Sequence, residues 1–318
     1  MSIPTTLPSR TRVYRCHHLD STRWDDLIPR PDDIVITTSL KAGTTWTQRI
    51  VSLLVFQSVE LPMTLHFCSP WVDSRFVGGR TELLRICEAL EHRRFFKSHL
   101  PLDALPYRET TKYIYVGRDT RDVFMSMWNH IRRYTATARE MLNGGENPPS
   151  QPFMEPPEDV RDFWRIWMTT GTYPWEGDGF PFWSHLHHAR SYWDYRHLPN
   201  LLMVHYNDLK ADLDGQMRRI ARFLEIEVPE SLWPRLVDAA TFASMKRDTH
   251  ILGPEMGVIF EGGADGFLFK GTNGRWRDVL VDEDLELYEV AAARTLTPEL
   301  KRWLELGAAS GVVPTTSR

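Results

Sequence analysis

The sequence predicts an α/β fold: a single domain with a central parallel sheet flanked by helices. Short apolar or aromatic runs, mostly bounded by Pro, Gly or Asp, read as buried strands at Asp33–Thr38, Arg93–His99, Lys112–Arg118 and Leu201–Tyr206. Helical stretches lie between these runs, and this alternation is typical of a parallel sheet covered on both faces. Any site is then expected at the carboxyl ends of the strands.

Two of the intervening stretches carry an apolar helical face. The residues on these faces are Trp46, Ile50, Leu53 and Leu54 in the first stretch and Val123, Met127 and Ile131 in the second. The Trp-rich stretch Phe163–Met168 is expected to be core. Two segments rich in Gly or Pro, 143–159 and 251–276, are expected to be long surface loops and are candidates for lids.

The bulk properties exclude several classes of protein. The chain has 318 residues, of which 42% are hydrophobic and 25% charged, as in ordinary globular proteins. A formal net charge of −4 argues against broad binding to nucleic acid or to an anionic membrane. Without a linker or repeat, we expect one domain over 1–318, with an N-terminal extension at 1–32, a core at 33–280 and C-terminal helices at 281–318.

The cysteines and the N-terminus predict where the protein resides. Cys16, Cys68 and Cys87 lack the spacing of metal ligands or redox pairs, so we interpret them as reduced thiols. The first residues have no apolar core of the signal-peptide kind, and no apolar run is long enough for a membrane span. These features predict a cytoplasmic protein with no membrane partner.

The segment SLKAGTTW, from Ser39 to Trp46, predicts an anion-binding loop. It joins a strand to a helix, where free backbone N–H groups and the positive end of the helix dipole meet an anion. Gly43 lets the backbone approach the ligand, Lys41 adds a positive charge, and Thr44 and Thr45 add hydroxyl groups. The loop resembles a P-loop only in part, because a kinase P-loop has its lysine directly after the second glycine, and Lys41 precedes Gly43.

Three further stretches occur in a fixed order after this loop: Phe95–Pro101, Tyr115–Trp128 and Phe267–Asp278. Together with the loop they resemble the cytosolic sulfotransferases, which use 3′-phosphoadenosine 5′-phosphosulfate (PAPS) and release adenosine 3′,5′-bisphosphate (PAP). The resemblance runs from about Asp33 to Asp278. It implies sulfuryl transfer from PAPS without a metal.

The resemblance also implies a role for individual residues. His99 matches the catalytic base, Lys97 the lysine two residues before it, and Lys41 the lysine on the oxygen that bridges sulfur and phosphorus. The remaining matches concern the donor nucleotide: Ala42, Gly43, Thr44, Thr45 and Trp46 in the loop, with Trp46 on adenine; Arg118 and Ser126 on the 3′-phosphate; Tyr206, Thr241 and Met245 near adenine; and Phe267, Lys270 and Gly271 in a late loop that closes over the 3′-phosphate.

The chain departs from the family pattern at several positions. Ala42 replaces a serine that the family is thought to use to restrain the lysine, which puts the suppression of idle donor hydrolysis in doubt. Phe269 replaces an arginine that donates to the 3′-phosphate, and Arg275 is a candidate to compensate. Ala240 stands where a threonine is common beside adenine. The dimer motif is degraded to Arg277, Val281, Asp282 and Glu286, so monomer and homodimer stay open.

The acceptor is the least defined part of this prediction. Phe67–Phe76 resembles a stretch near the acceptor in hydroxysteroid-type members, which makes Trp71 and Phe76 candidate substrate contacts, although both could be core. With 12% aromatic residues, the chain favours a small, mainly hydrophobic phenol or alcohol. Two alternatives remain: a magnesium-dependent nucleoside or small-molecule kinase, and a catalytically silent nucleotide-binding protein.

Overall fold

The computed structural model describes residues 4, 6–75, 79–145 and 147–314, and its centre is a four-stranded sheet. The strands are β1 (Ile34–Thr37), β2 (Phe95–Ser98), β3 (Lys112–Gly117) and β4 (Leu201–His205), in the order β2-β1-β3-β4. All three strand pairs are parallel. The structure therefore confirms the predicted α/β class, and each predicted strand is present to within two residues at either end.

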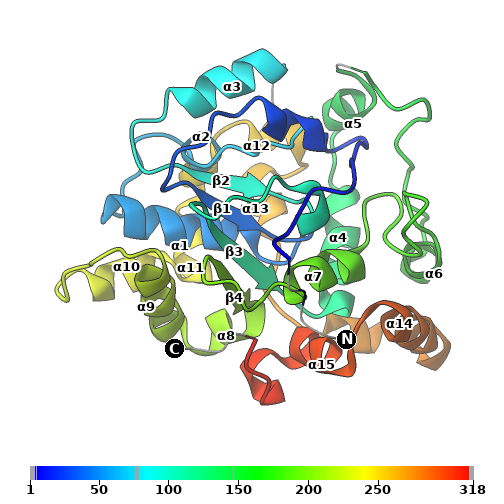
Figure 1. Cartoon of the computed structure of the whole chain (residues 1–318). Helices are drawn as coiled ribbons and strands as arrows, with labels where there is room; N and C mark the ends of the chain where they lie inside the picture. Colours follow the sequence, from blue (N-terminus) through cyan, green and yellow to red (C-terminus); the bar gives the residue numbers. More distant parts are fainter. Residues whose placement is uncertain (1–3, 5, 76–78, 146, 315–318) are drawn as a thin grey trace.

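Helices surround the sheet (Figure 1). The α-helices of the described residues are α1 (Thr44–Phe56), α2 (Leu65–Cys68), α3 (Arg80–Glu88), α4 (Thr120–Ile131), α5 (Ala136–Asn143), α6 (Val160–Thr169), α7 (His185–Trp193), α8 (Tyr206–Ala211), α9 (Leu213–Phe223), α10 (Trp233–Ala239), α11 (Phe242–Arg247), α12 (Met256–Ile259), α13 (Gly263–Phe267), α14 (Asp282–Thr295) and α15 (Pro298–Leu306). Short 3₁₀ helices lie at η1 (Ser21–Asp25), η2 (Leu102–Ala104), η3 (Thr249–Leu252), η4 (Arg275–Asp278) and η5 (Gly307–Ser310). Among the described residues, no helix is both long and apolar enough to span a bilayer.

The two faces of the sheet carry separate hydrophobic cores. Successive side chains of a strand point to opposite faces, and in β3 Ile114 and Val116 pack against α1, α9 and α10. Tyr113 and Tyr115 of the same strand pack on the other side, in the core that includes α4, α6, α7 and α15. Figure 1 shows these two groups of helices on opposite sides of the sheet. The apolar faces predicted for α1 and α4 are accordingly buried, apart from the half-buried Trp46.

The two segments predicted as loops differ from each other. Over its described residues, the stretch between α5 and α6 has no helix or strand, although Phe153 within it is buried. The glycine-rich stretch 251–276 is not an open loop, because it contains α12 and α13 and joins η4. Met256, Ile259 and Phe267 of this stretch pack against the core, which gives these short helices the apolar contacts that their length alone could not supply. The Trp-rich stretch in α6 is core, as predicted.

The amino ends of the strands are closed by a buried ion pair. Arg94 donates to both carboxylate oxygens of Asp33, at 2.8 and 2.7 Å, and neither side chain is more than 5% exposed. Such a bidentate pair satisfies both charges in a buried environment. At the carboxyl ends of the same strands there is a cavity instead.

Candidate functional site

A cavity of about 550 Å³ lies at the carboxyl ends of the strands. The register of the sheet places Thr37 beside both Ser98 and Tyr115, and Gly117 beside His205, so the residues that follow the strands meet at one edge. Fifteen of the residues matched to site positions from the sequence line this cavity: Lys41, Gly43, Thr44, Thr45, Trp46, Trp71, Lys97, His99, Arg118, Ser126, Tyr206, Met245, Phe267, Lys270 and Gly271. Residues spread over 231 positions of the chain thus form one site.

Three predicted residues are not part of this lining. The side chain of Ala42 is fully buried, and Thr241 caps α11 by accepting a hydrogen bond from the Ser244 N–H at 3.1 Å. The neighbouring Phe242 lines the cavity instead. Phe76 lies outside the residues that the structure describes.

The loop between β1 and α1 has the backbone geometry of an anion cradle. Lys41 has a φ of +64° and Gly43 a φ of +117°, both in the left-handed region. A Cβ atom at position 43 would lie 3.1 Å from the ring of Tyr206, so glycine is needed here for space as well as conformation. The Arg118 guanidinium donates to the Lys41 carbonyl at 2.9 Å and ties the loop to the end of β3.

The ammonium group of Lys41 faces His130 and an aromatic ring. Its Nζ atom lies 3.3 Å from Nδ1 of His130 and 4.5 Å from the ring centre of Phe267. Burial lowers the pKa of Lys41 to about 7, and the positive charges of Lys97 and Arg118 act in the same direction. An anion in the cavity would favour the charged form of this lysine.

His99 follows β2 and is held in a defined orientation. Its Nδ1 lies 2.8 Å from the Thr38 carbonyl oxygen, which can only accept, so Nδ1 carries the proton and Nε2 keeps a lone pair. The backbone N–H of His99 donates to Asp73 at 3.1 Å. Burial, together with the charge of Lys97, places the pKa of His99 well below its ordinary value. The ring is therefore neutral at pH 7 and able to accept a proton.

Trp71 forms the wall beside these groups. Nζ of Lys97 lies 4.2 Å from its ring centre, and the edge-on ring of His99 is centred 4.9 Å away. The indole N–H of Trp71 donates to buried Asp73 at 2.8 Å. Burial lowers the pKa of Lys97 to about 8, which the negative charge of Asp73 partly opposes. Trp71 therefore lines the cavity rather than the core, and it contacts the Lys97 ammonium group and the His99 ring.

A second basic cluster also lines the cavity. The Arg118 guanidinium lies 4.1 Å from the ring centre of Tyr206 and donates to Asn273 at 2.7 Å. Arg275, which also lines the cavity, lies over the ring of Phe269 at 5.4 Å. Within the described part of the chain, the buried Nε atoms of both arginines have no hydrogen-bond partner. Two unpaired N–H donors on adjacent guanidinium groups form a site for an anion.

The aromatic wall next to this cluster is formed by Trp46 and Tyr206. Their rings meet edge to face with centres 5.3 Å apart, and the Trp46 indole donates to the Ala240 carbonyl at 2.7 Å. Met245 and Phe242 complete this side of the cavity. The wall offers flat apolar surfaces to a planar ring and sits beside the unpaired arginine donors.

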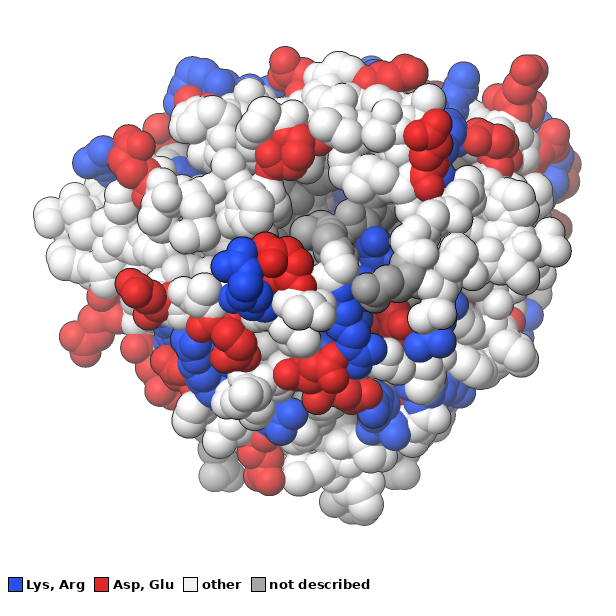
Figure 2. All heavy atoms as spheres, turned by 90° about the horizontal axis from the view of Figure 1, so that it is seen from above, with Lys and Arg blue, Asp and Glu red and all other residues white. Residues whose placement is uncertain are grey.

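The mouth of the cavity is apolar. Phe67, Met141 and Val258, on α2, α5 and α12, line the cavity and are 36 to 48% exposed. Figure 2 looks onto the face that carries α2, α3 and α12, and shows a hollow near its middle that is bordered by uncharged and by charged residues. A group of exposed large apolar side chains at a cavity mouth favours an apolar ligand.

Sequence reasoning missed His130, His18 and Phe242, all of which line the cavity. His130 could have been found from its spacing, because it lies four residues after Ser126 and hence on the same face of α4. His18 carries no such signal, because the N-terminal segment reaches the site only through the tertiary fold.

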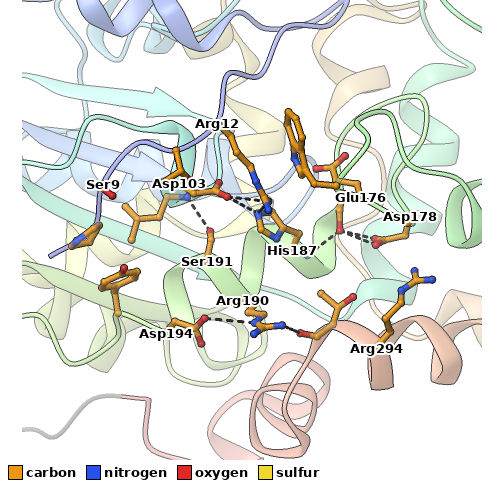
Figure 3. Close-up of a pocket in the computed structure, with 18 residues that line it drawn as sticks. Ser9, Arg12, Asp103, Glu176, Asp178, His187, Arg190, Ser191, Asp194 and Arg294 are labelled. Atoms are coloured by element: carbon orange, nitrogen blue, oxygen red, sulfur yellow. Dashed lines mark hydrogen bonds and ion pairs between the residues drawn. The ribbon is translucent and has the colours of Figure 1, made fainter. Parts of the chain in front are cut away.

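A second cavity, of about 530 Å³, has a different character (Figure 3). Some of its charged side chains are paired with one another, but Glu176, Asp178 and Arg294, which also line it, form no ion pair among the described residues. Asp103 lies 3.1 Å from Arg12 and 2.9 Å from His187, and Arg190 lies 3.6 Å from Asp194. Its volume matches that of the first cavity, but none of the residues predicted for the site lines it.

Comparison with known proteins decides the family. The family described as "Sulfotransferase domain" matches residues 31–297. The chain is 33% identical over 316 residues to the glycolipid sulfotransferase of Mycobacterium bovis (strain BCG / Pasteur 1173P2), covering 93% of this chain and 94% of that protein. The chain belongs to the sulfotransferase family.

Solved structures share the fold of this sulfotransferase. A mouse sulfotransferase complexed with PAP matches with a TM-score of 0.66 and 19% identity, covering 90% of this chain and 92% of that one. Retinol dehydratase in a complex with retinol and PAP matches with a TM-score of 0.65 and 24% identity, covering 88% and 87%. These structures show that the fold is shared, and membership of the sulfotransferase family makes this chain an enzyme that transfers a sulfuryl group.

Proposed function

We propose that this sulfotransferase uses PAPS as donor and a hydroxyl of a small, mainly hydrophobic phenol or alcohol as acceptor. The observation that carries the proposal is the placement of a neutral histidine and several unpaired cations in one cavity. Within the described residues, none of Lys41, Lys97, Arg118, Lys270 and Arg275 forms an ion pair with a carboxylate. Cations that form no direct ion pair fit a ligand that carries several negative charges.

The donor half of the cavity fits a nucleotide with a 3′-phosphate. The unpaired Nε atoms of Arg118 and Arg275 would hold that phosphate together with Ser126, Lys270 and Gly271. Arg275 would supply a donor that the family usually has at position 269, where this chain has Phe. Trp46, Tyr206 and Met245 would contact adenine. PAPS supplies a sulfuryl group already activated by its bond to phosphate.

In the other half of the cavity, His99 would accept a proton and Lys41 would stabilise a developing negative charge. Nε2 of His99 would take the proton of the acceptor hydroxyl, which makes its oxygen a better nucleophile. Lys41 would neutralise the negative charge that develops on the oxygen bridging sulfur and phosphorus as the bond to sulfur breaks. Stabilising that charge more than the ground state is what accelerates the reaction. Lys97 and Trp71 would border the acceptor beside His99.

The apolar mouth supports a hydrophobic acceptor. Phe67, Met141 and Val258 would cover an apolar part of the acceptor while its hydroxyl reaches His99. An acceptor with an apolar chain would also agree with the glycolipid named for the Mycobacterium relative. Each methylene that enters such a surface contributes about 0.8 kcal/mol.

The test is sulfuryl transfer from ³⁵S-labelled PAPS in the presence of EDTA. Phenols, primary alcohols of increasing chain length and oligosaccharides are offered as acceptors, and ATP with magnesium is titrated in parallel with PAP. We expect metal-independent binding of PAP, weak binding of ATP, and kcat/KM that rises with the length of the apolar chain. Preference for ATP with magnesium would overturn the donor, and transfer only to oligosaccharides would overturn the acceptor class.

A further inference from the structure

The feature that the proposed chemistry leaves unexplained is the contact between Lys41 and His130. A lysine ammonium has three N–H donors, and in the described part of the chain the Lys41 ammonium has one hydrogen-bond acceptor, Nδ1 of His130 at 3.3 Å. Its other neighbour is the ring face of Phe267, 4.5 Å away. A four-carbon side chain has many rotamers, so a single acceptor has a large influence on where the charge lies.

His130 is itself rigidly placed. It lies on α4, four residues after Ser126, so both side chains project from one face of that helix into the cavity. Three aromatic rings surround it, with centres at 5.2 Å for Tyr134, 4.7 Å for Phe260 and 5.8 Å for Phe267. A ring held by three others can define the position of a flexible partner.

The protonation state of His130 suits it to accept. Burial is the main cause that lowers its pKa well below the ordinary value, and the positive charge of Lys41 adds to the effect. His18, Lys97 and His99 also face it and act in the same direction. No carboxylate is among the groups that shift the pKa of His130, so the ring is neutral near pH 7 and Nδ1 can accept from the ammonium.

We propose that His130 is a positioning residue for sulfuryl transfer: its Nδ1 accepts a hydrogen bond from the Lys41 ammonium and fixes the charge that stabilises the leaving oxygen. The role rests on the function proposed above for Lys41. One N–H of the ammonium points to His130, and the other two stay available for oxygen atoms of the donor. The charge is thereby placed before the reaction starts, which is the condition for electrostatic stabilisation of a transition state.

The alternative is that His130 only fills space among the aromatic rings. Two substitutions separate these roles. His130→Phe keeps an aromatic ring for Tyr134 and Phe260 but has no acceptor. His130→Asn loses the ring but places an amide oxygen on Cγ, the carbon that carries Nδ1 in histidine. A positioning role predicts that the Asn variant is the more active, and a space-filling role predicts the reverse.

The experiment measures kcat and the donor KM for the wild type, both variants, Lys41→Met and the two double variants with Lys41→Met. We expect His130→Phe to lower kcat by about tenfold to a hundredfold with little change in donor KM, and His130→Asn to recover most of the loss. In the Lys41→Met background, His130→Phe should have no further effect, because its action passes through Lys41.

Three outcomes would overturn the positioning role: a His130→Phe variant with the kcat of the wild type, a His130→Asn variant less active than His130→Phe, or an equal loss of kcat in the presence and absence of Lys41. If His130→Phe does not fold, as judged by thermal melting, His130→Leu replaces it as the variant without an acceptor. Failure of the proposed function is distinguishable, because it would appear as a wild-type enzyme whose transfer is unaffected by Lys41→Met.

Discussion

The two cavities of this enzyme have almost the same volume, about 550 and 530 Å³, but differ in charge: the first gathers lysines and arginines, and the second mixes acidic and basic side chains. In the first, the lysines and arginines form no direct ion pair with a carboxylate among the described residues, and two arginine Nε atoms are buried and unpaired. In the second, Asp103 is shared by Arg12 and His187, and Arg190 pairs with Asp194. The difference teaches that an excess of unpaired cations, rather than volume, makes the first cavity suitable for an anion.

Their places in the fold explain this contrast. The first cavity lies where four parallel strands end, so residues from distant parts of the chain are forced to the same edge. The second lies on the flank of the sheet, between the N-terminal segment around Arg12, α7, and the end of α14, as Figure 3 shows. The ion pairs of Asp103 join the N-terminal segment to α7, and Arg190 of α7 donates to the Thr295 carbonyl at the end of α14 at 3.2 Å. The first cavity therefore keeps hydrogen-bond donors that no described residue uses, and the second uses several of its charged groups for contacts between its own walls.

The largest expected effect concerns His99. Replacing it with Asn keeps a polar side chain but removes the ring nitrogen Nε2 that would accept the proton, so kcat should fall by about 10² to 10⁴-fold. Affinity for PAP, measured by calorimetry, should stay near that of the wild type because His99 lies on the acceptor side. Near-normal turnover in this variant would exclude His99 as the base.

A smaller effect should separate the two cavities directly. Arg118→Met removes a charged donor from the first cavity and should weaken PAP binding by about 2 kcal/mol, roughly 30-fold. The matched control is Arg190→Met, which removes an arginine that is already paired in the other cavity. Calorimetry should find PAP affinity unchanged in the control. Equal losses in the two variants would mean that the contrast between the cavities has no bearing on nucleotide binding.

The smallest expected effect is on the free energy of unfolding, and it concerns Glu176 in the second cavity. Burial raises the pKa of Glu176 to about 8, so the folded state binds a proton that the unfolded state releases near pH 4.5. The free energy of unfolding contributed by this proton is therefore present at low pH and is lost as the pH rises from about 4.5 to about 8. Glu176→Gln cannot lose a proton and should gain about 1 kcal/mol or more relative to the wild type between pH 5 and pH 8.

Urea unfolding at the two pH values measures this gain. Glu109→Gln is the control, because Glu109 is exposed and its substitution should leave the pH dependence unchanged. If Glu176→Gln shows the same pH dependence as the wild type, the carboxyl is not protonated in the folded state, and the charges of the second cavity are organised differently from the description above.

Much of the fold and of the site could be predicted from local sequence. The four strands were predictable because each is a short run rich in apolar, β-branched or aromatic residues. Such a run is the main sequence signal of a buried parallel strand. The loop at Lys41 was predictable because its lysine, glycine and hydroxyl residues are consecutive. The prediction that 251–276 is a loop was wrong, since the stretch contains helices. These helices were missed because they are too short for a periodic signal in the sequence and depend on tertiary contacts.

The sequence by itself determined which residue types stand at the strand ends, and with them the α/β class, the anion loop and the resemblance to sulfotransferases. Only the tertiary structure decided which of these residues share a cavity, that Arg275 lies near Arg118, and that His130 meets Lys41 across 89 positions of the chain. The physical reason is that strand and loop signals act between neighbours in sequence. Charge pairing and burial depend on distances that exist only once the sheet and its helices have packed.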